Sequence, residues 1–304
     1  MPEEGIRTMT VVGDVRAVGK SERHATGRGG VSRWALGYLA LLACAALAAP
    51  ILAPYGFNQQ DYAAVLQGPS GGHLLGTDEL GRDVLSRLLY GGRVSMESML
   101  IAVAVGAGFG VPAGLISGFV GRWVDAVTMR IADTLLAFPT LVLAIAVTAA
   151  LGRGTVRVMV AVGIVIAPSF ARMMRAQVLV VKNRLYVDAA KSFGMSRLWI
   201  IARHVAPNAI QPVLVLTAHM LGVVLLVEAS LSFLGLGTPP PYPSWGGMLR
   251  EATRNSGGLA IQIIAPGLVI ASTLLAVNLV GDRLRDALDP RATRQNRRRE
   301  PPGA

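Results

Sequence analysis

Uncharged, mostly apolar runs recur along this chain at a length that suits membrane-spanning helices. A helix needs about 20 predominantly apolar residues to cross a bilayer. The fourth run, residues 158–171, is short, so its helix is expected to continue until Arg172 and Arg175 reach the headgroup level. The pattern predicts an all-α, polytopic membrane protein with six transmembrane helices, at about residues 34–54, 96–120, 134–152, 156–176, 209–234 and 258–280.

Composition and charge agree with a membrane location. Hydrophobic residues make up 52% of the chain and charged residues only 15%. Six spans place both termini on one side, and 22 of the 29 Lys and Arg residues fall on that side. By the positive-inside rule this side is the cytoplasm, so we expect a multi-pass protein of the cell (inner or plasma) membrane with both termini cytoplasmic. The net charge of +11 then reflects topology and contact with membrane lipids rather than binding to nucleic acid.

The two ends of the chain differ from the apolar core. Residues 1–32 are polar and glycine-rich with scattered bases, which is typical of disorder, and residues 292–304 carry a cluster of arginines. We expect a disordered cytoplasmic tail over 1–32, a transmembrane domain over 33–291 and a basic cytoplasmic tail over 292–304. Cys44 is the single cysteine, so the chain forms no internal disulfide.

Residues 184–208 form a charged stretch between two predicted spans. Within it, Gly194 suits the left-handed conformation that ends a helix, and Ser196 suits the N-cap of a second helix that runs toward Pro207. Ala189 and Ala190 would leave a surface poor in side chains, where another protein's backbone could approach. This pattern indicates a docking loop, although an ordinary helical connection in the cytoplasm fits the spacing equally well.

Four glycines, Gly106, Gly110, Gly114 and Gly118, recur every four residues in the second predicted span. This spacing places them on one helical face, where small residues allow helix backbones to approach closely in lipid. A nucleotide-binding glycine loop is disfavoured because the surrounding residues 98–121 are uncharged and predicted to span the membrane. The spacing leaves open whether the packing partner lies in this chain or in another subunit.

Glu228 and His219 are polar residues within the fifth predicted span. A charge at this depth is costly, so Glu228 should face the bundle interior or a water-filled cavity. It could relay protons or contact a peptide amino group, but the favoured interpretation is a structural carboxyl near the outer end, hydrogen-bonded to small residues of a neighbouring helix. His219 is a candidate pathway residue on the same span.

Residues that could support catalysis or hold a metal are scattered. The four histidines, His24, His73, His204 and His219, fall on separate segments, and no second cysteine is present. No nucleophile motif occurs either. We therefore expect no catalytic site, no metal site and no cofactor in this chain.

An amphipathic helix is predicted in the outer segment that follows His73. Thr77 or Asp78 would cap it, and Asp83 and Arg87 would form an i,i+4 ion pair along it. Taken alone, this pattern indicates a helix at the membrane interface.

Several separate motifs resemble one known family. Asp188-Ala189-Ala190, Gly194 and Pro207 resemble the EAA loop of permease subunits in bacterial ATP-binding-cassette (ABC) importers, with Asp188 in place of the usual Glu and Ala206 in place of the usual Leu. Four further segments are similar to the second permease of the dipeptide, oligopeptide and nickel importers, and the likeness covers roughly residues 31–291. These segments are residues 76–95, 228–237, 243–249 and 282–291.

The resemblance implies a type I importer permease fold and a function in transport. A subunit of this kind forms a pathway for di- or oligopeptides or similar small solutes, beside a second, homologous permease and below an extracytoplasmic solute-binding protein. Two ATPase subunits bind the ATP and Mg²⁺. The coupling residues would be Asp188, Ala189, Ala190, Gly194 and Pro207.

Three alternatives stay open at this point. A permease of the same type could carry nickel, opines or another non-peptide solute. An ion-coupled secondary transporter would use Glu228, and a membrane scaffold or receptor would have no need of the docking loop.

Overall fold

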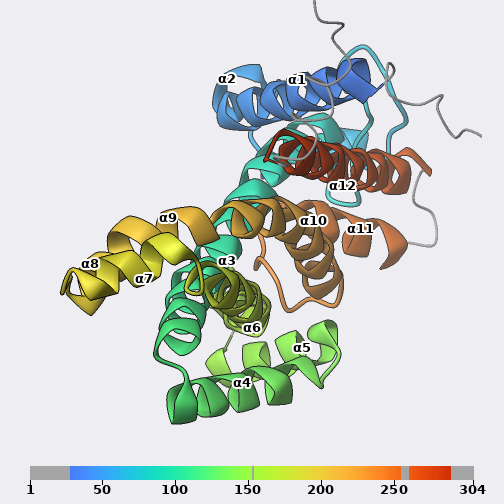
Figure 1. Cartoon of the computed structure of the whole chain (residues 1–304). Coiled ribbons are helices and arrows are strands. Elements are labelled where there is room, and N and C mark those ends of the chain that lie inside the picture. The colour runs from blue at the N-terminus through green and yellow to red at the C-terminus, as the bar shows by residue number, and fades with distance from the viewer. Residues whose placement is uncertain (1–27, 153, 255–259, 289–304) are drawn as a thin grey trace, which may run out of the picture.

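The chain folds into helices, as the sequence predicts, joined by turns and by two longer segments, residues 53–83 and 234–244 (Figure 1). The structure is a computed structural model that describes residues 28–152, 154–254 and 260–288, so most of the two expected tails lies outside the described residues. Within those ranges no strand occurs, only two isolated β-bridges, Gln60 with Arg82 and Thr77 with Asp83. The helices are α1 (Arg28–Leu47), α2 (Ala49–Leu52), α3 (Val84–Val120), α4 (Arg122–Leu136), α5 (Thr140–Leu151), α6 (Thr155–Val181), α7 (Leu185–Ser192), α8 (Arg197–Ile200), α9 (Ala206–Ala209), α10 (Gln211–Phe233), α11 (Trp245–Arg254) and α12 (Ala260–Leu288), with the short 3₁₀-helix Tyr62–Ala64 and the π-helix Ile201–Val205.

The central element is α3, which packs along α6 in the most extensive helix–helix interface of the described chain. All four glycines of the repeat lie on this interface. A Cβ at Gly110 would collide with the carbonyl oxygen of Ala167, and one at Gly114 with that of Ala171. At Gly106 it would lie 2.6 Å from Ile166 Cγ1. The surface that the glycines approach therefore belongs to α6 of the same chain.

Two groups of loops gather at opposite ends of this helix pair. At one end, Trp245 and Ala46 lie against Gly92 near the start of α3, next to residues 53–83. At the other end, Lys182 donates a hydrogen bond to the carbonyl oxygen of Gly118 at 2.7 Å. The segments predicted to lie outside and those predicted to lie inside are thus on opposite ends of the bundle.

The remaining long helices complete the bundle around α3. The α10 helix contacts both α3 and α12, and α1 packs against α12 and α3. Tyr38 of α1 and Ser272 of α12 share a hydrogen bond of 2.6 Å between their hydroxyls.

Two of the predicted spans are not continuous helices in the structure. Among the described helices, four are long and apolar enough to cross a membrane: α3, α6, α10 and α12. The expected continuous span 134–152 is wrong, because α4 and α5 meet at an angle of 98° beside Pro139, which cannot donate a helical hydrogen bond. Counted together, this bent pair would be a fifth span. The expected first span is interrupted at Ala48, between α1 and α2, and its described apolar helix, Arg33–Leu47, is shorter than a full span.

The outer helix begins later than its sequence suggests. Asp83, rather than Thr77 or Asp78, is the N-cap, and its carboxylate accepts a hydrogen bond of 2.7 Å from the Ser86 amide. The expected pair of Asp83 with Arg87 is wrong, because a cap residue lies outside the helix and faces its first turn. Asp83 instead lies 3.0 Å from Nδ1 of His73.

The glycine face gives a prediction with a control on the same helix. Gly110→Val should weaken the α3–α6 interface, because the added side chain overlaps the Ala167 carbonyl, and overpacking of this kind costs about 1–3 kcal/mol. Gly108→Val should have little effect, since a Cβ there meets nothing within 4 Å. Thermal unfolding of the purified protein in detergent measures the difference. Equal midpoints for the two variants would contradict the close approach.

Candidate functional site

A compact lobe, residues 185–209, projects from the body of the molecule (Figure 1). It consists of α7, α8, the π-helix and α9. We refer to it below as the 185–209 lobe. All five residues that the sequence singles out for coupling lie in it: Asp188, Ala189, Ala190, Gly194 and Pro207.

The turn between α7 and α8 depends on Gly194. Its φ of +70° lies in the left-handed region, where a Cβ is unfavourable. The Met195 amide donates to the Ala190 carbonyl at 3.2 Å, and the Gly194 amide donates to the Lys191 carbonyl at 3.0 Å. These two bonds form a Schellman motif, which satisfies the last carbonyls of α7 and fixes where the chain reverses.

The second half of the lobe runs directly into α10. Ser196 caps α8 by accepting a hydrogen bond of 3.3 Å from the Trp199 amide. The expected single helix toward Pro207 is instead interrupted by the π-helix Ile201–Val205, in which the Ala206 amide donates to the Ile201 carbonyl. A π-helical turn contains one residue more than an α-helical turn. This wider turn accommodates Pro207, which has no N–H to donate. Backbone hydrogen bonds continue through Ile210 and Leu214, so the lobe is joined directly to α10 across a bend at Ile210.

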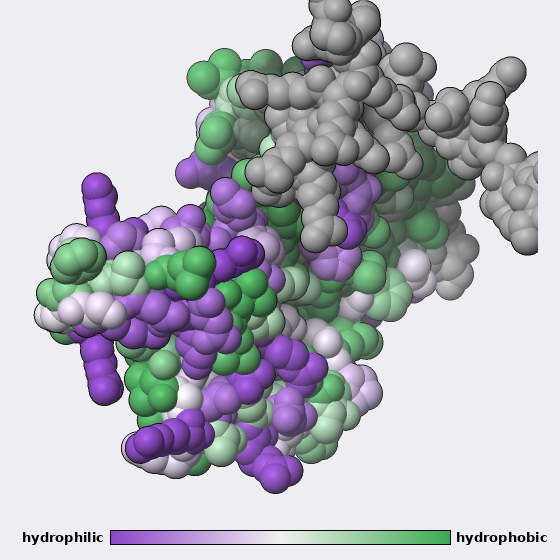
Figure 2. All heavy atoms as spheres, in the orientation of Figure 1, coloured by the Kyte–Doolittle hydropathy of each residue, from purple (hydrophilic) through white to green (hydrophobic). Residues whose placement is uncertain are grey.

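The surface of the lobe exposes large apolar side chains, at the start of α7 and on both sides of the α7–α8 turn. Leu185, Phe193 and Leu198 are 88%, 82% and 80% exposed. Figure 2 shows that hydrophobic and hydrophilic residues are mixed on the face of the lobe that it displays. Three exposed apolar groups on one projecting element indicate a surface that a protein partner covers.

The two alanines of the lobe have different environments. Ala189 is exposed, whereas Ala190 is only 5% exposed. The expectation that both alanines contribute to the surface is therefore wrong for Ala190. On a helix, positions three apart share a face, so Ala190 points inward with Val187 while Ala189 and Asp188 point outward. Asp188 accepts a salt bridge of 2.8 Å from Lys191.

The root of the lobe is held by an ion pair on α6. Arg175 donates two hydrogen bonds of 2.6 Å to the carboxylate of Asp125, in the first turn of α4. Ser117 of α3 donates to the same carboxylate at 2.7 Å. Three helices thus meet at one carboxylate immediately below the lobe, which fixes the α6 end from which α7 begins.

Glu228 lies at the other end of α10 and is buried, with 1% exposure. Its Oε1 accepts a hydrogen bond of 2.8 Å from Ser232, and the hydroxyls of Ser95 and Ser244 interact with the same carboxyl. Its Oε2 has no partner with hydrogen-bond geometry. The carboxyl therefore joins α10 to α3 and to the segment before α11. His219 differs, because it is exposed on the surface of α10.

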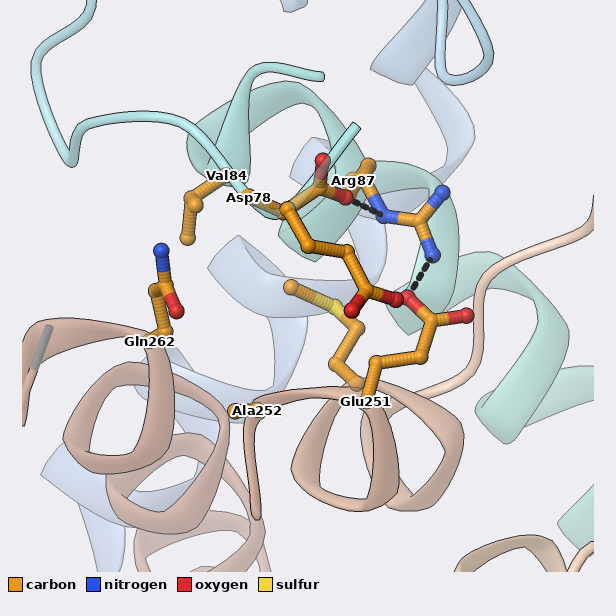
Figure 3. Close-up of a pocket in the computed structure, with 8 residues that line it drawn as sticks. Asp78, Val84, Arg87, Glu251, Ala252 and Gln262 are labelled. Atoms are coloured by element: carbon orange, nitrogen blue, oxygen red, sulfur yellow. Dashed lines mark hydrogen bonds and ion pairs between the residues drawn. The ribbon is translucent and has the colours of Figure 1, made fainter. Parts of the chain in front are cut away.

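A network of charges that the sequence analysis missed ties α11 to the start of α3 (Figure 3). Glu251 accepts hydrogen bonds from Arg87 at 2.7 Å and from Arg82 at 3.0 Å. Asp78 pairs with Arg82 at 2.7 Å and lies 3.4 Å from Arg87. Residues 78 and 251 are far apart in sequence, so only the fold brings them together. The adjoining pocket, of about 20 Å³, has room for about one water and is too small for a solute.

No metal centre is found in the part of the chain that the structure describes. A search of those residues gives no group of three or more His, Cys, Asp or Glu side chains arranged to hold an ion. The candidate site consists of the projecting 185–209 lobe, the long helix α10 attached to it, and the charge network at the outer end.

Comparisons with known proteins agree with this arrangement. The fold is similar to the permease of a methionine ABC transporter, MetNI, solved in inward-facing conformations. Two such structures give TM-scores of 0.55 and 0.56 at 15% and 16% identity, and cover 67% of this chain and 96% and 97% of theirs. At this identity the likeness establishes the fold alone, which is the type I ABC importer permease fold.

The sequence defines the family. Residues 110–294 match the family described as binding-protein-dependent transport system inner membrane component. The glutathione transport system permease protein GsiD of Pectobacterium atrosepticum is 44% identical over 255 residues, which cover 84% of this chain and 85% of the relative. The protein of the same name from Escherichia coli O1:K1 is 43% identical over the same length, covering 84% of each chain. The chain belongs to this family of inner-membrane permeases.

Membership of the family settles the class of function. The chain is a multi-pass membrane subunit of an ABC importer and not itself an enzyme, because ATP hydrolysis belongs to a separate subunit. Permeases of this family work with a partner permease, ATPases and a solute-binding protein. An ion-coupled secondary transporter and a membrane scaffold are thereby excluded.

The position of Glu228 gives a prediction about its role. Glu228→Gln keeps the acceptor for Ser232 but cannot change charge, so solute uptake and its pH dependence should match those of the unaltered protein. Glu228→Leu removes the shared acceptor and should lower stability by about 1–3 kcal/mol. Uptake by the reconstituted transporter and thermal unfolding measure the two effects. Loss of uptake in a fully assembled Glu228→Gln transporter would indicate a proton relay instead.

Proposed function

We propose that this chain forms half of the solute pathway of an importer for short peptides of the size of glutathione. The other half would be a second, homologous permease in a heterodimer. Two ATPase subunits would bind the ATP and Mg²⁺, one docking on the 185–209 lobe and the other on the second permease, and an extracytoplasmic binding protein would deliver solute to the opposite end. Both termini would lie in the cytoplasm.

The observation that carries the proposal is the form of the lobe. It combines an exposed apolar tip with an internal architecture that fixes its shape, namely the Gly194 turn and the Ser196 cap. A simple connection between two helices would need neither. The excess of Lys and Arg on this side of the predicted topology supports a cytoplasmic position, where the ATPases are available.

The path of the backbone suggests how ATP hydrolysis would move the pathway. The lobe leads through α9 and the bend at Ile210 into α10, and α10 ends near Glu228, whose carboxyl interacts with α3 and the segment before α11. A displacement of the tip by the ATPases would therefore tilt α10 as a lever. The pathway between the two permeases would then open alternately to the two sides of the membrane.

The solute is inferred from the relatives. Two relatives at 43–44% identity are named as glutathione permeases, and the outer segments 76–95 and 228–237 resemble those of peptide importers. A non-peptide solute such as nickel or an opine is the alternative within the same fold. Within the described residues, the absence of a cluster of three metal-binding side chains gives no specific support to nickel.

Gly194 provides the test of coupling. Gly194→Val should disturb the turn because φ is +70°, although a Cβ there meets nothing within 4 Å. Gly194→Asn is the matched control, since Asn tolerates the left-handed conformation better than a β-branched residue does. We expect the Gly194→Val protein to insert into the membrane normally but to retain ATPase subunits poorly. Its rate of glutathione uptake should fall at least about tenfold. Gly194→Asn should be affected much less.

The measurements are copurification of the ATPase subunits with the permease and uptake into proteoliposomes with the cognate binding protein. Copurification tests docking independently of the solute. If Gly194→Val retains the ATPases and transports as well as Gly194→Asn, the lobe is only a connection. If docking behaves as predicted but glutathione is not taken up by the unaltered transporter, the solute assignment alone is wrong.

A further inference from the structure

A basic cavity lies between the 185–209 lobe and the corner where α3 meets α4. Its volume is about 750 Å³, within the range of pockets that hold drug-sized ligands. Four of its lining residues are cationic, and no acidic residue lines it. The remaining lining residues are mostly apolar. The basic residues are Arg122, Lys182, Lys191 and Arg197, and the apolar ones include Phe119, Val120, Trp123, Met195 and Ile200.

Two of the four cations remain available for a ligand. Lys182 is engaged with the Gly118 carbonyl, and Lys191 with Asp188. Arg122 and Arg197 are both exposed, and neither forms an ion pair with any of the residues that the structure describes. They come from different elements, the start of α4 and the start of α8, and the fold brings them to the same cavity.

The end of the second predicted span places the cavity at the expected depth of the lipid headgroups. Arg122 is the first charged residue after the uncharged run 98–121, so it marks the end of the apolar part of α3. Trp123 follows it directly and is 74% exposed, a position that suits a tryptophan at the membrane–water interface. A cavity lined by both cations and apolar side chains matches a molecule with an anionic head and hydrocarbon chains.

We propose that this cavity binds an anionic phospholipid, with its phosphate at Arg122 and Arg197 and its upper acyl chains against Phe119, Val120 and Trp123. The inference rests on the proposed function in one respect, that this end of the bundle faces the cytoplasmic leaflet, where anionic headgroups attract basic segments. The C-terminal residues 292–304 do not complement the cavity, because they are themselves strongly basic.

A lipid in this position would have a mechanical consequence. The same headgroup would contact the α3–α4 corner, which belongs to the body, and α8, which belongs to the lobe. It would therefore restrain the lobe relative to α3 and make the coupling surface sensitive to the charge of the membrane. A soluble phosphate would need no apolar wall.

The test is lipid titration of the full chain, purified in detergent and followed by native mass spectrometry. Phosphatidylglycerol and phosphatidylcholine with identical acyl chains are the probes. The Arg122→Gln/Arg197→Gln double variant should bind phosphatidylglycerol about 30-fold more weakly, as expected for the loss of two cations at an interface. Arg130→Gln, which removes an exposed cation of α4 outside the cavity, is the control and should bind normally.

Three results would overturn the proposal. The first is an affinity of the double variant equal to that of Arg130→Gln. The second is equal binding of the two lipids by the unaltered chain. The third is displacement of phosphatidylglycerol by an equal concentration of glycerol 3-phosphate, which would identify a site for soluble phosphate.

A second variant addresses the stability of the protein. Arg122→Lys/Arg197→Lys keeps both charges and should bind phosphatidylglycerol within about threefold of the unaltered chain, since a point charge suffices for a phosphate. Weak binding by this folded variant would also contradict the proposal. Lipid binding is measured without the ATPase subunits and without transport. A failure of the lipid proposal is therefore distinguishable from a failure of the proposed coupling function.

Discussion

The close approach of α3 and α6 is the constraint on which the rest of the molecule depends. Lipid tails are as apolar as leucine, so burial of apolar surface does not drive helices together in a bilayer. Association has to come from packing, which small residues permit. Gly110 and Gly114 bring α3 directly against the α6 backbone. Because α6 leads into the lobe and α3 carries the outer segment, this one interface fixes the two ends of the bundle relative to each other.

The two ends have different physical characters, which suit different tasks. The outer end is held by the buried cations Arg82 and Arg87, which pair with the half-buried carboxylates of Asp78 and Glu251. The 185–209 lobe has few connections to the body apart from its two helical continuations and exposes its apolar tip. A long helix that is fixed at its outer end can be tilted by a force on the lobe at its other end, and so can act as a lever. The π-helix before Pro207 lies where the lobe joins α10, at the base of that lever.

Local features were predictable from the sequence because they depend on neighbouring residues. The glycine period gave the packing face of α3, and Gly194 with Ser196 gave the turn and cap of the lobe. Features set by distant residues were not predictable. The Asp78–Glu251 network and the burial of Ala190 each depend on what a segment packs against. The uncharged run predicted a span that begins at about residue 96. In the structure α3 begins at Val84, because its first turns are polar and precede the apolar part of the helix.

The central claim is that the 185–209 lobe is where this permease meets its ATPase. Site-specific photo-crosslinking in the assembled transporter tests it most directly. A photoreactive amino acid in place of Ala189, which is exposed on the lobe, should give a covalent product that contains an ATPase subunit. The same amino acid in place of Tyr62, exposed at the opposite end of the bundle, should give none. An ATPase adduct from position 62, or none from position 189 in an assembled and active transporter, would contradict the account.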